Sequence, residues 1–296
     1  MQTSIKSLIV TLMVFFIIGC SKGGNPVDPS STEMVYPLAV GNEWSYNRIF
    51  STFNFRSVHD SIPKPADFTV SMKTDIVISR VETIQGAIPT FVLMDITYDG
   101  MRTYTGEFYY NNREDGLYKF ANKGTSLAVP KVTQNKKILF KGRYFNSINE
   151  ITAFIEFGSN FYSSSLDSLY YEVPPLKSLP RKYRLGDQWT FRTKNNPLRI
   201  DKKIIGKESI EIIGRNFECY KIQWLIDFDN NGEWEKDIEF FDWVSPEGLI
   251  RRTILYKDIA WIGSGSPDPI GKFDAKEEIS LTNLSVKSNI SSLTGK

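Results

Sequence analysis

Alternation of apolar and polar residues with a period of two is the feature that most constrains what this chain can fold into. In residues 90–98, the alternate apolar side chains are Val92, Met94, Ile96 and Tyr98. In residues 217–228, one face carries Tyr220, Ile222, Trp224, Ile226 and Phe228. This period is typical of β-strands, and an aromatic content of 14% favours the same structure. We therefore predict an all-β fold of antiparallel sheets, either a curved half-barrel or sandwich-like, with only short helices, near residues 146–157.

A second constraint is that two motifs occur twice, in the same order. GNEWSY at residues 41–46 matches GDQWTF at residues 186–191, and EFYYNNREDGLYKF at residues 107–120 aligns without gaps to EFFDWVSPEGLIRR at residues 239–252. This order predicts an internal duplication into two related β units, at residues 34–171 and 172–290. The boundary is placed at VPPLKSLPRK because proline breaks regular structure. Both one curved sheet and two separate domains are compatible with this pattern.

The repeated motifs contain residue types that specify a fold rather than a reaction. Four glycines occupy expected tight turns, where glycine adopts a positive φ angle at little cost: Gly41, Gly116, Gly186 and Gly248. Trp44 and Trp189 follow the first turn of each half. We expect both tryptophans to enter a strand and to bury their large side chains.

The first residues have the pattern of a bacterial export signal. Lys6 precedes an uncharged, apolar run at residues 7–19, which is too short to cross a hydrocarbon core of ~30 Å as a helix. The run ends in IIGC, which resembles a lipobox, although its second isoleucine is bulkier than the usual residue. We therefore predict that residues 1–19 are a signal peptide and that Cys20 is lipidated. Residues 20–33 are rich in Gly, Pro and Ser and predict a flexible tether, and residues 291–296 are expected to form a disordered tail.

The lipobox, the tether and the motifs PLxxGNxW and GLxxR together resemble a broad group of uncharacterised lipoproteins of Gram-negative bacteria. The matching segments are Tyr36–Tyr46, Leu185–Phe191, Phe217–Arg252 and Glu277–Val286. The resemblance implies several acyl chains on Cys20, with a lipid membrane as the partner, and a sheet that curves like the half-barrels of periplasmic lipoprotein carriers. Ser21 stands where an Asp would favour the inner membrane. The outer membrane is therefore the expected location within the cell envelope.

Residues 227–235 are the best candidate for a metal site. Oxygen-bearing side chains at Asp227, Asp229, Asn231 and Glu235, with a glycine at the sixth position, resemble the start of a calcium loop. The twelfth position is Ile238, so the bidentate acid of such a loop is missing. A β-hairpin turn requires the same residue types, and we favour the turn over calcium. No other cofactor is expected.

The sequence contains no recognised constellation for catalysis. It lacks a nucleophile elbow, a phosphate-binding loop and a dinucleotide fingerprint. With Cys20 lipidated, Cys219 has no partner for a disulfide, and we expect it to be a small buried residue. A catalytic thiol would need the single histidine, His59, which lies in a polar stretch far away in sequence.

These observations favour a binding protein over an enzyme or a nucleic-acid-binding protein. Removal of the signal lowers the formal charge from +2 to +1, which gives no reason to expect nucleic acid. We expect a non-catalytic module of the cell envelope that contacts a protein or a polysaccharide. One alternative is a carrier of a lipid or another amphiphile, with a contiguous apolar cavity of several hundred Å³ in a curved sheet. Another alternative is a binder of cell-surface glycans, because aromatic runs at residues 108–110 and 240–243 are candidates for a sugar-binding surface.

Overall fold

The computed structural model describes residues 32–58, 60, 65–84, 88–124, 137–158, 168–194, 197–263 and 268–287. The predicted signal peptide, Cys20, His59 and the tail lie outside these residues, as does most of the tether. The strands are β1 Thr32–Glu33, β2 Glu43–Ser57, β3 Phe68–Ile84, β4 Ile88–Tyr98, β5 Thr103–Arg113, β6 Gly116–Gly124, β7 Lys137–Phe140, β8 Arg143–Phe145, β9 Leu169–Pro180, β10 Lys182–Tyr183, β11 Gln188–Arg192, β12 Arg199–Ile212, β13 Arg215–Asp227, β14 Ile238–Ser245, β15 Gly248–Ile262 and β16 Pro269–Ser285. A helix, α1, spans Ile148–Phe157.

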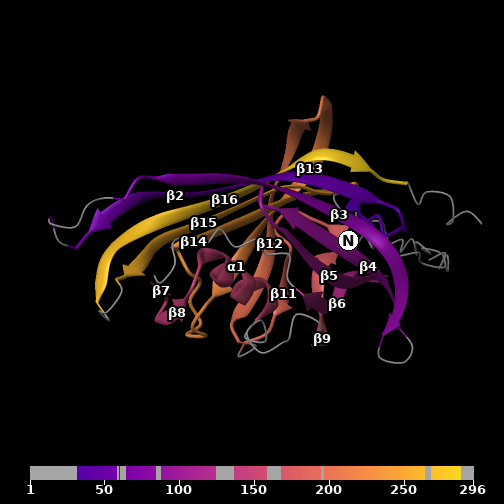
Figure 1. Cartoon of the computed structure of the whole chain (residues 1–296). Coiled ribbons are helices and arrows are strands. Elements are labelled where there is room, and N and C mark those ends of the chain that lie inside the picture. The colour runs from indigo at the N-terminus through magenta and orange to yellow at the C-terminus, as the bar shows by residue number, and fades with distance from the viewer. Residues whose placement is uncertain are drawn as a thin grey trace, which may run out of the picture.

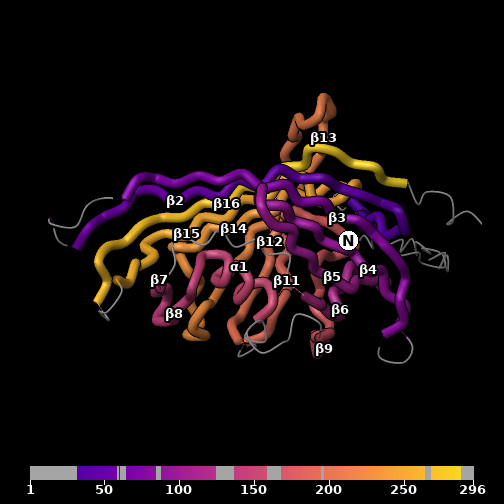
Figure 2. Tube along the Cα trace, viewed as in Figure 1, coloured from indigo at the N-terminus to yellow at the C-terminus, as the bar shows by residue number. Residues whose placement is uncertain are grey.

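The predicted all-β, antiparallel fold is confirmed. Twelve strands follow one another in the order β11-β12-β13-β14-β15-β16-β2-β3-β4-β5-β6-β9, and β7 and β8 extend the same sheet beside β15. The short strands β1 and β10 pair separately. Because β16 pairs with β2, the two sequence halves share one continuous sheet, and Figure 2 shows the yellow β16 beside the indigo β2. The two halves therefore form one curved sheet, neither a sandwich nor two separate domains.

The sheet curls so far that its two end strands, β9 and β11, come into contact (Figure 1). Their described residues form no backbone ladder with each other. Side chains join them instead, and the indole Nε1 of Trp189 on β11 donates to the carbonyl oxygen of Lys177 on β9 at 3.0 Å. The result is a nearly closed barrel, and we refer to this contact between β9 and β11 as the seam.

The prolines near the predicted boundary do not end the strand in which they lie. β9 runs through VPPLKSLP, but its ladder with β6 contains a bulge: Lys119 pairs with Leu176, and Ala121 pairs with Tyr171. Residues 172–175, which include two prolines, therefore have no partner in the β6 ladder. Proline is tolerated at a bulge in an end strand, because no ladder hydrogen bond is lost there. The prolines therefore interrupt the ladder with β6 without ending the strand, and the division into two related halves stays a prediction.

The two copies of the opening motif have matching backbone geometry. The N–H of Gly41 donates to the carbonyl of Ile78, and the N–H of Gly186 donates to that of Ile204, both at 2.9 Å. Each isoleucine donates its own N–H back to the turn, again at 2.9 Å. The φ angles of the two glycines are 88° and 91°. β3 and β12 also bulge directly after these isoleucines, so the motifs lie at equivalent places in the two halves of the sheet.

The two motif tryptophans are buried to different extents. Trp44 is 0% exposed, and its Nε1 donates to the carbonyl of Glu247 at 2.7 Å, in the turn between β14 and β15. Trp189 departs from the expectation because it is only partly buried. It lies on an end strand, where its indole packs against the edge of a buried apolar cluster. Trp44 therefore connects β2 to a distant turn, and Trp189 connects β9 to β11.

An insert between β6 and β9 places a helix on the concave side of the sheet (Figure 1). Ser147 caps the helix by accepting the backbone N–H of Glu150 at 3.3 Å, and Gly158 follows its last turn with a φ angle of 77°. Ile151, Phe154 and Ile155 are buried in the main apolar cluster inside the sheet. Among the described residues, no helix has the length and apolar character that crossing a membrane requires.

We predict that Gly248→Ala strongly destabilises the fold. The φ angle of Gly248 is 124°, and a Cβ at this position would lie 2.8 Å from Nε1 of the buried Trp44. Unfavourable backbone conformation and steric overlap add, so we expect a loss of about 3 kcal/mol in the free energy of unfolding. Denaturant titration measures this loss. The control is Gly214→Ala, whose Cβ would meet nothing within 4 Å and which should lose only about 1 kcal/mol. Equal losses in the two variants would contradict the role assigned to Trp44.

Candidate functional site

A cavity of about 200 Å³ lies inside the barrel, and we call it the interior cavity. Every strand of the twelve-strand path except β16 contributes to its wall. Its polar lining residues are Tyr36, Tyr46, Asp95, Tyr110, Lys119, Glu156, Ser178, Lys202, Asp242 and Arg252. Its apolar lining residues are Ile76, Leu93, Phe108, Leu117, Phe157, Leu179, Phe191, Trp224, Val244 and Leu249. The site thus combines an apolar surface with several charged groups inside the sheet.

Arg252 on β15 organises one side of the interior cavity. Its Nε donates to Asp242 on β14 at 2.6 Å, and its guanidinium also pairs with the carboxylate of Glu156 near the end of α1. The second oxygen of Asp242 accepts the indole N–H of Trp224 at 2.8 Å. Burial alone would lower the pKa of Arg252, but these carboxylates raise it, so the guanidinium stays charged. The arginine therefore ties the helix to the barrel wall.

The seam holds a second buried ion cluster. Glu172, in the bulge of β9, lies 3.1 Å from the ammonium of Lys119 and 3.3 Å from the guanidinium of Arg192. Arg192 also donates to the carbonyl of Glu156 at 3.0 Å. The last carbonyls of a helix carry partial negative charge, which favours cations at this end. Glu172 and the helix end thus neutralise the cations of β6 and β11 where the sheet closes.

Lys202 on β12 is buried differently from these cations. It is 4% exposed and donates to the carbonyl of Ser178 across the seam at 3.3 Å. Its ammonium lies 3.8 Å from the ring centroid of Trp224 and 4.2 Å from that of Phe191. Burial lowers the pKa of Lys202 to about 7, against the smaller opposing effect of Asp242. In the described residues it forms no ion pair with a carboxylate.

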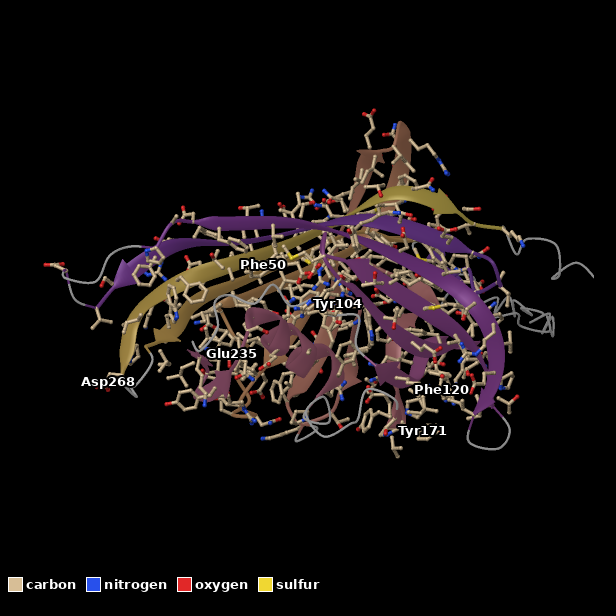
Figure 3. The ribbon with its side chains drawn as sticks, in the orientation of Figure 1. Phe50, Tyr104, Phe120, Tyr171, Glu235 and Asp268 are labelled. Carbon is tan, nitrogen blue, oxygen red and sulfur yellow. The ribbon has the colours of Figure 1, made fainter. Side chains whose placement is uncertain are left out.

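A second pocket, of about 230 Å³, lies under the ends of β2, β15 and β16, and we call it the mouth pocket. Figure 3 labels Asp268, just before β16, at this end of the molecule and Phe120 at the opposite end. The lining residues are Thr52, Phe53, Phe55, Pro65, Ala66, Asp67, Phe68, Ile138, Asn146, Ser147, Ile148, Trp261 and Phe273. The rings of Phe55 and Trp261 meet edge to face, with centroids 5.7 Å apart. Ala66 and Phe68 are exposed, so the pocket opens to solvent.

The two spaces are not the contiguous apolar cavity that a carrier was expected to have. The interior cavity contacts the end of α1 through Glu156 and Phe157, whereas the mouth pocket contacts its start through Ser147 and Ile148. The buried residues of α1 fill the barrel between these positions. The insert therefore divides the space inside the sheet into the interior cavity, whose wall includes several charged groups, and the mouth pocket, whose wall is mainly apolar.

The predicted metal-site residues hold a turn together. The carboxylate of Asp227 accepts the N–H of Gly232 at 2.9 Å, and the side chain of Asp229 accepts the side-chain amide of Asn231 at 3.1 Å. Glu235 points elsewhere and pairs with Lys141. No group of three or more acidic, His or Cys side chains gathers in a metal-binding arrangement among the described residues. The favoured hairpin is present, although residues 228–237 form a loop longer than a tight turn.

The remaining sequence-based candidates have structural roles or lie outside the described residues. Cys219 is fully buried, as predicted, and burial raises the pKa of its thiol to about 12. A thiol with this pKa is a poor nucleophile. Gly116 and Gly248 occupy the turns between β5 and β6 and between β14 and β15, with φ angles of 156° and 124°. Lipidation of Cys20 stays a prediction.

Sequence reasoning missed the charged lining of the interior cavity, although the repeats contained a signal for it. Aligned positions of the two motif copies line the same cavity in three cases: Tyr46 with Phe191, Tyr110 with Asp242, and Leu117 with Leu249. At these three places, the residue that lines the cavity in one copy has a counterpart that lines it in the other. Lys202 had no such signal, because it lies between the motifs.

We predict that Lys202 makes the stability of the fold depend on pH. Between pH about 7 and the ordinary lysine pKa of 10.5, the unfolded chain binds a proton that native Lys202 lacks. The unfolding free energy should therefore rise with pH in this range, by up to about 1.4 kcal/mol per unit, and this cost should be complete below pH about 7. Lys202→Met should remove the slope and be more stable near pH 7 in denaturant titrations. Lys203→Met, on the opposite face of β12, should keep it, and equal slopes in all three proteins would refute the assignment.

Comparison with known proteins adds few constraints. No protein-family model matches this chain, and no curated protein matches it significantly. Among solved structures, it is similar to a "putative lipoprotein" from Parabacteroides distasonis ATCC 8503, with 15% identity and a TM-score of 0.36 over 86% of this chain and 99% of the other. It is also similar to a "putative exported protein with YmcC-like fold" from Bacteroides fragilis NCTC 9343, with 10% identity and a TM-score of 0.36 over 86% and 100%.

Proposed function

We propose that this protein is a non-catalytic binding protein of the bacterial cell envelope that holds the apolar part of a small amphiphile in the mouth pocket. The observation that carries the proposal is the aromatic lining of an open pocket, with Phe55, Phe68, Trp261 and Phe273 around one space. Small-molecule sites are typically concave and mostly apolar, with a few polar groups at the margin. Here the polar margin is formed by Asp67, Asn146 and Ser147.

The size of the pocket limits the ligand. A protein cavity of about 150 Å³ can hold benzene, so a pocket of about 230 Å³ holds a ring or a short chain rather than a whole lipid. The ligand is then a small amphiphile, or one apolar end of a larger molecule whose polar part stays in solvent. The protein would then be a carrier that encloses only part of its ligand.

The sequence supports attachment to a membrane. A basic residue, a short apolar run and a cysteine directly after it form the pattern of a lipoprotein signal, so acylated Cys20 is the proposed anchor. Residues 21–33 are the proposed tether, and Ser21 favours the outer membrane over the inner one. The absence of a catalytic motif supports a binding role, as does the mutual pairing of Arg252 with Asp242 and Glu156.

A dye-binding experiment tests the mouth pocket. N-phenyl-1-naphthylamine, an apolar fluorescent probe, should bind to residues 21–296 and brighten on entry into the pocket. Ala66→Trp should weaken its binding at least roughly tenfold, because the new indole fills the pocket. Thr69→Trp adds the same ring on the exposed outer face of β3 and should leave binding unchanged. Equal binding by both variants would place the dye elsewhere and remove the support for this site.

The anchor is tested separately. In a Gram-negative host, the wild-type protein should fractionate with membranes, and mass spectrometry should find acyl chains on Cys20. Cys20→Ala should block lipidation, because the thiol is the acceptor, and the protein should then be released or keep its signal peptide. Normal cleavage and unchanged acylation of this variant would contradict the lipoprotein assignment.

A further inference from the structure

The interior cavity contains a buried amine that the proposed function does not use. Lys202 lines this cavity, is 4% exposed, and has one oxygen partner in the described structure, the carbonyl of Ser178. An ammonium group can donate three hydrogen bonds. The two aromatic rings beside it supply only their faces. Its donor capacity toward the cavity is therefore largely unused.

The neighbouring cations are satisfied by contrast. Lys119 and Arg192 pair with Glu172, and Arg252 pairs with Asp242 at 2.6 Å. Lys202 differs from these three cations because it forms no ion pair in the described residues. A buried charge without a counter-charge is costly in free energy. An anion that binds beside the ammonium of Lys202 supplies the missing counter-charge and is therefore attracted strongly.

The acidic residues that face the cavity are engaged elsewhere. Asp242 accepts from Arg252 and from the indole of Trp224, and Glu156 pairs with Arg252. Asp95 on β4 accepts the hydroxyl of Thr97 at 3.1 Å, and it adds a smaller contribution to that of Glu277, which raises the pKa of Arg48 against the effect of burial. Lys119 and three tyrosines, Tyr36, Tyr46 and Tyr110, complete the charged and titratable lining. None of these acids forms an ion pair with Lys202.

We propose that the interior cavity is a binding site for a small carboxylate with an apolar body, and that Lys202 receives its carboxylate. The apolar wall is formed by Leu93, Phe108, Leu117, Leu179 and Leu249, which are suited to a ring or a branched chain. A volume of about 200 Å³ exceeds the roughly 150 Å³ that holds benzene, so a ring with a short acidic side chain is the size expected.

Binding at this site is linked to protonation of Lys202. Burial keeps the pKa of this amine near 7, so above neutral pH the empty site holds a neutral amine. A bound carboxylate favours the ammonium form and raises the pKa, so the complex takes up a proton from solvent. Asp242 and Glu156 already favour the charged form of Lys202, whereas Arg252 and Lys119 oppose it. We therefore expect the proton that is taken up on ligand binding to go to the amine of Lys202.

Calorimetry with phenylacetate tests this site in the full-length protein, held in a nonionic detergent. Titrations near pH about 8.5, in two buffers of different ionisation enthalpy, should show binding with uptake of close to one proton per ligand. Lys202→Met should weaken binding at least roughly thirtyfold and abolish the uptake, whereas Lys203→Met should change neither. Phenylacetamide, which is neutral and has nearly the same shape, should bind at least roughly tenfold more weakly than phenylacetate.

Any of the following results would overturn the proposal: no binding of phenylacetate by the wild type, equal binding by Lys202→Met, or equal binding of the amide. Ala66→Trp separates this site from the mouth pocket, because it should leave phenylacetate binding and proton uptake unchanged. Loss of phenylacetate binding in that variant would place the ligand in the mouth pocket and refute the interior site. Failure of the dye experiment alone would leave the interior site intact.

Discussion

The structure depends on the neutralisation of charges inside a nearly closed sheet. Arg252 and Asp242 face each other within the barrel, and Glu172 holds two cations at the seam. Charges in such a place cost several kcal/mol each when they have no partner. These ion pairs therefore stabilise the pairing of β14 with β15 and the contact between β9 and β11, which no backbone ladder holds together in the described residues.

The helix is part of this electrostatic arrangement as well as of the apolar core. Its buried face fills the barrel, and its last turn places the carbonyl and the carboxylate of Glu156 among Arg192 and Arg252. The two halves of the sheet have similar strand orders, but among the described residues only the first half carries this insert. The asymmetry gives the molecule two unlike compartments, one at each end of α1.

The sequence predicted the strands well because period-two alternation survives in them. Residues Tyr220, Ile222 and Trp224 of β13 are buried on one face, as their spacing indicated. In β4 the alternation was also present, but the interior cavity is lined by the other face, through Leu93 and Asp95. In a sequence, a polar residue in a strand is expected to face solvent, so a polar residue that points into a barrel is assigned to the wrong face when its partners are unknown. The ion clusters were therefore invisible in the sequence, since Glu172 and Arg192 meet only after the sheet has closed.

The pairing of β16 with β2 has a consequence for how the chain reaches its fold. Trp44 pairs with Leu284, so the middle of the finished sheet joins residues from opposite ends of the sequence. Contacts between residues so far apart form slowly, because a long loop must close before they gain anything. Until β16 pairs with it, β2 has a bonded neighbour on the β3 side and an open edge on the other. That edge can pair with strands of other molecules until β16 reaches it. The interval between formation of the β2–β3 pair and arrival of β16 therefore sets how long the folding protein is exposed to aggregation.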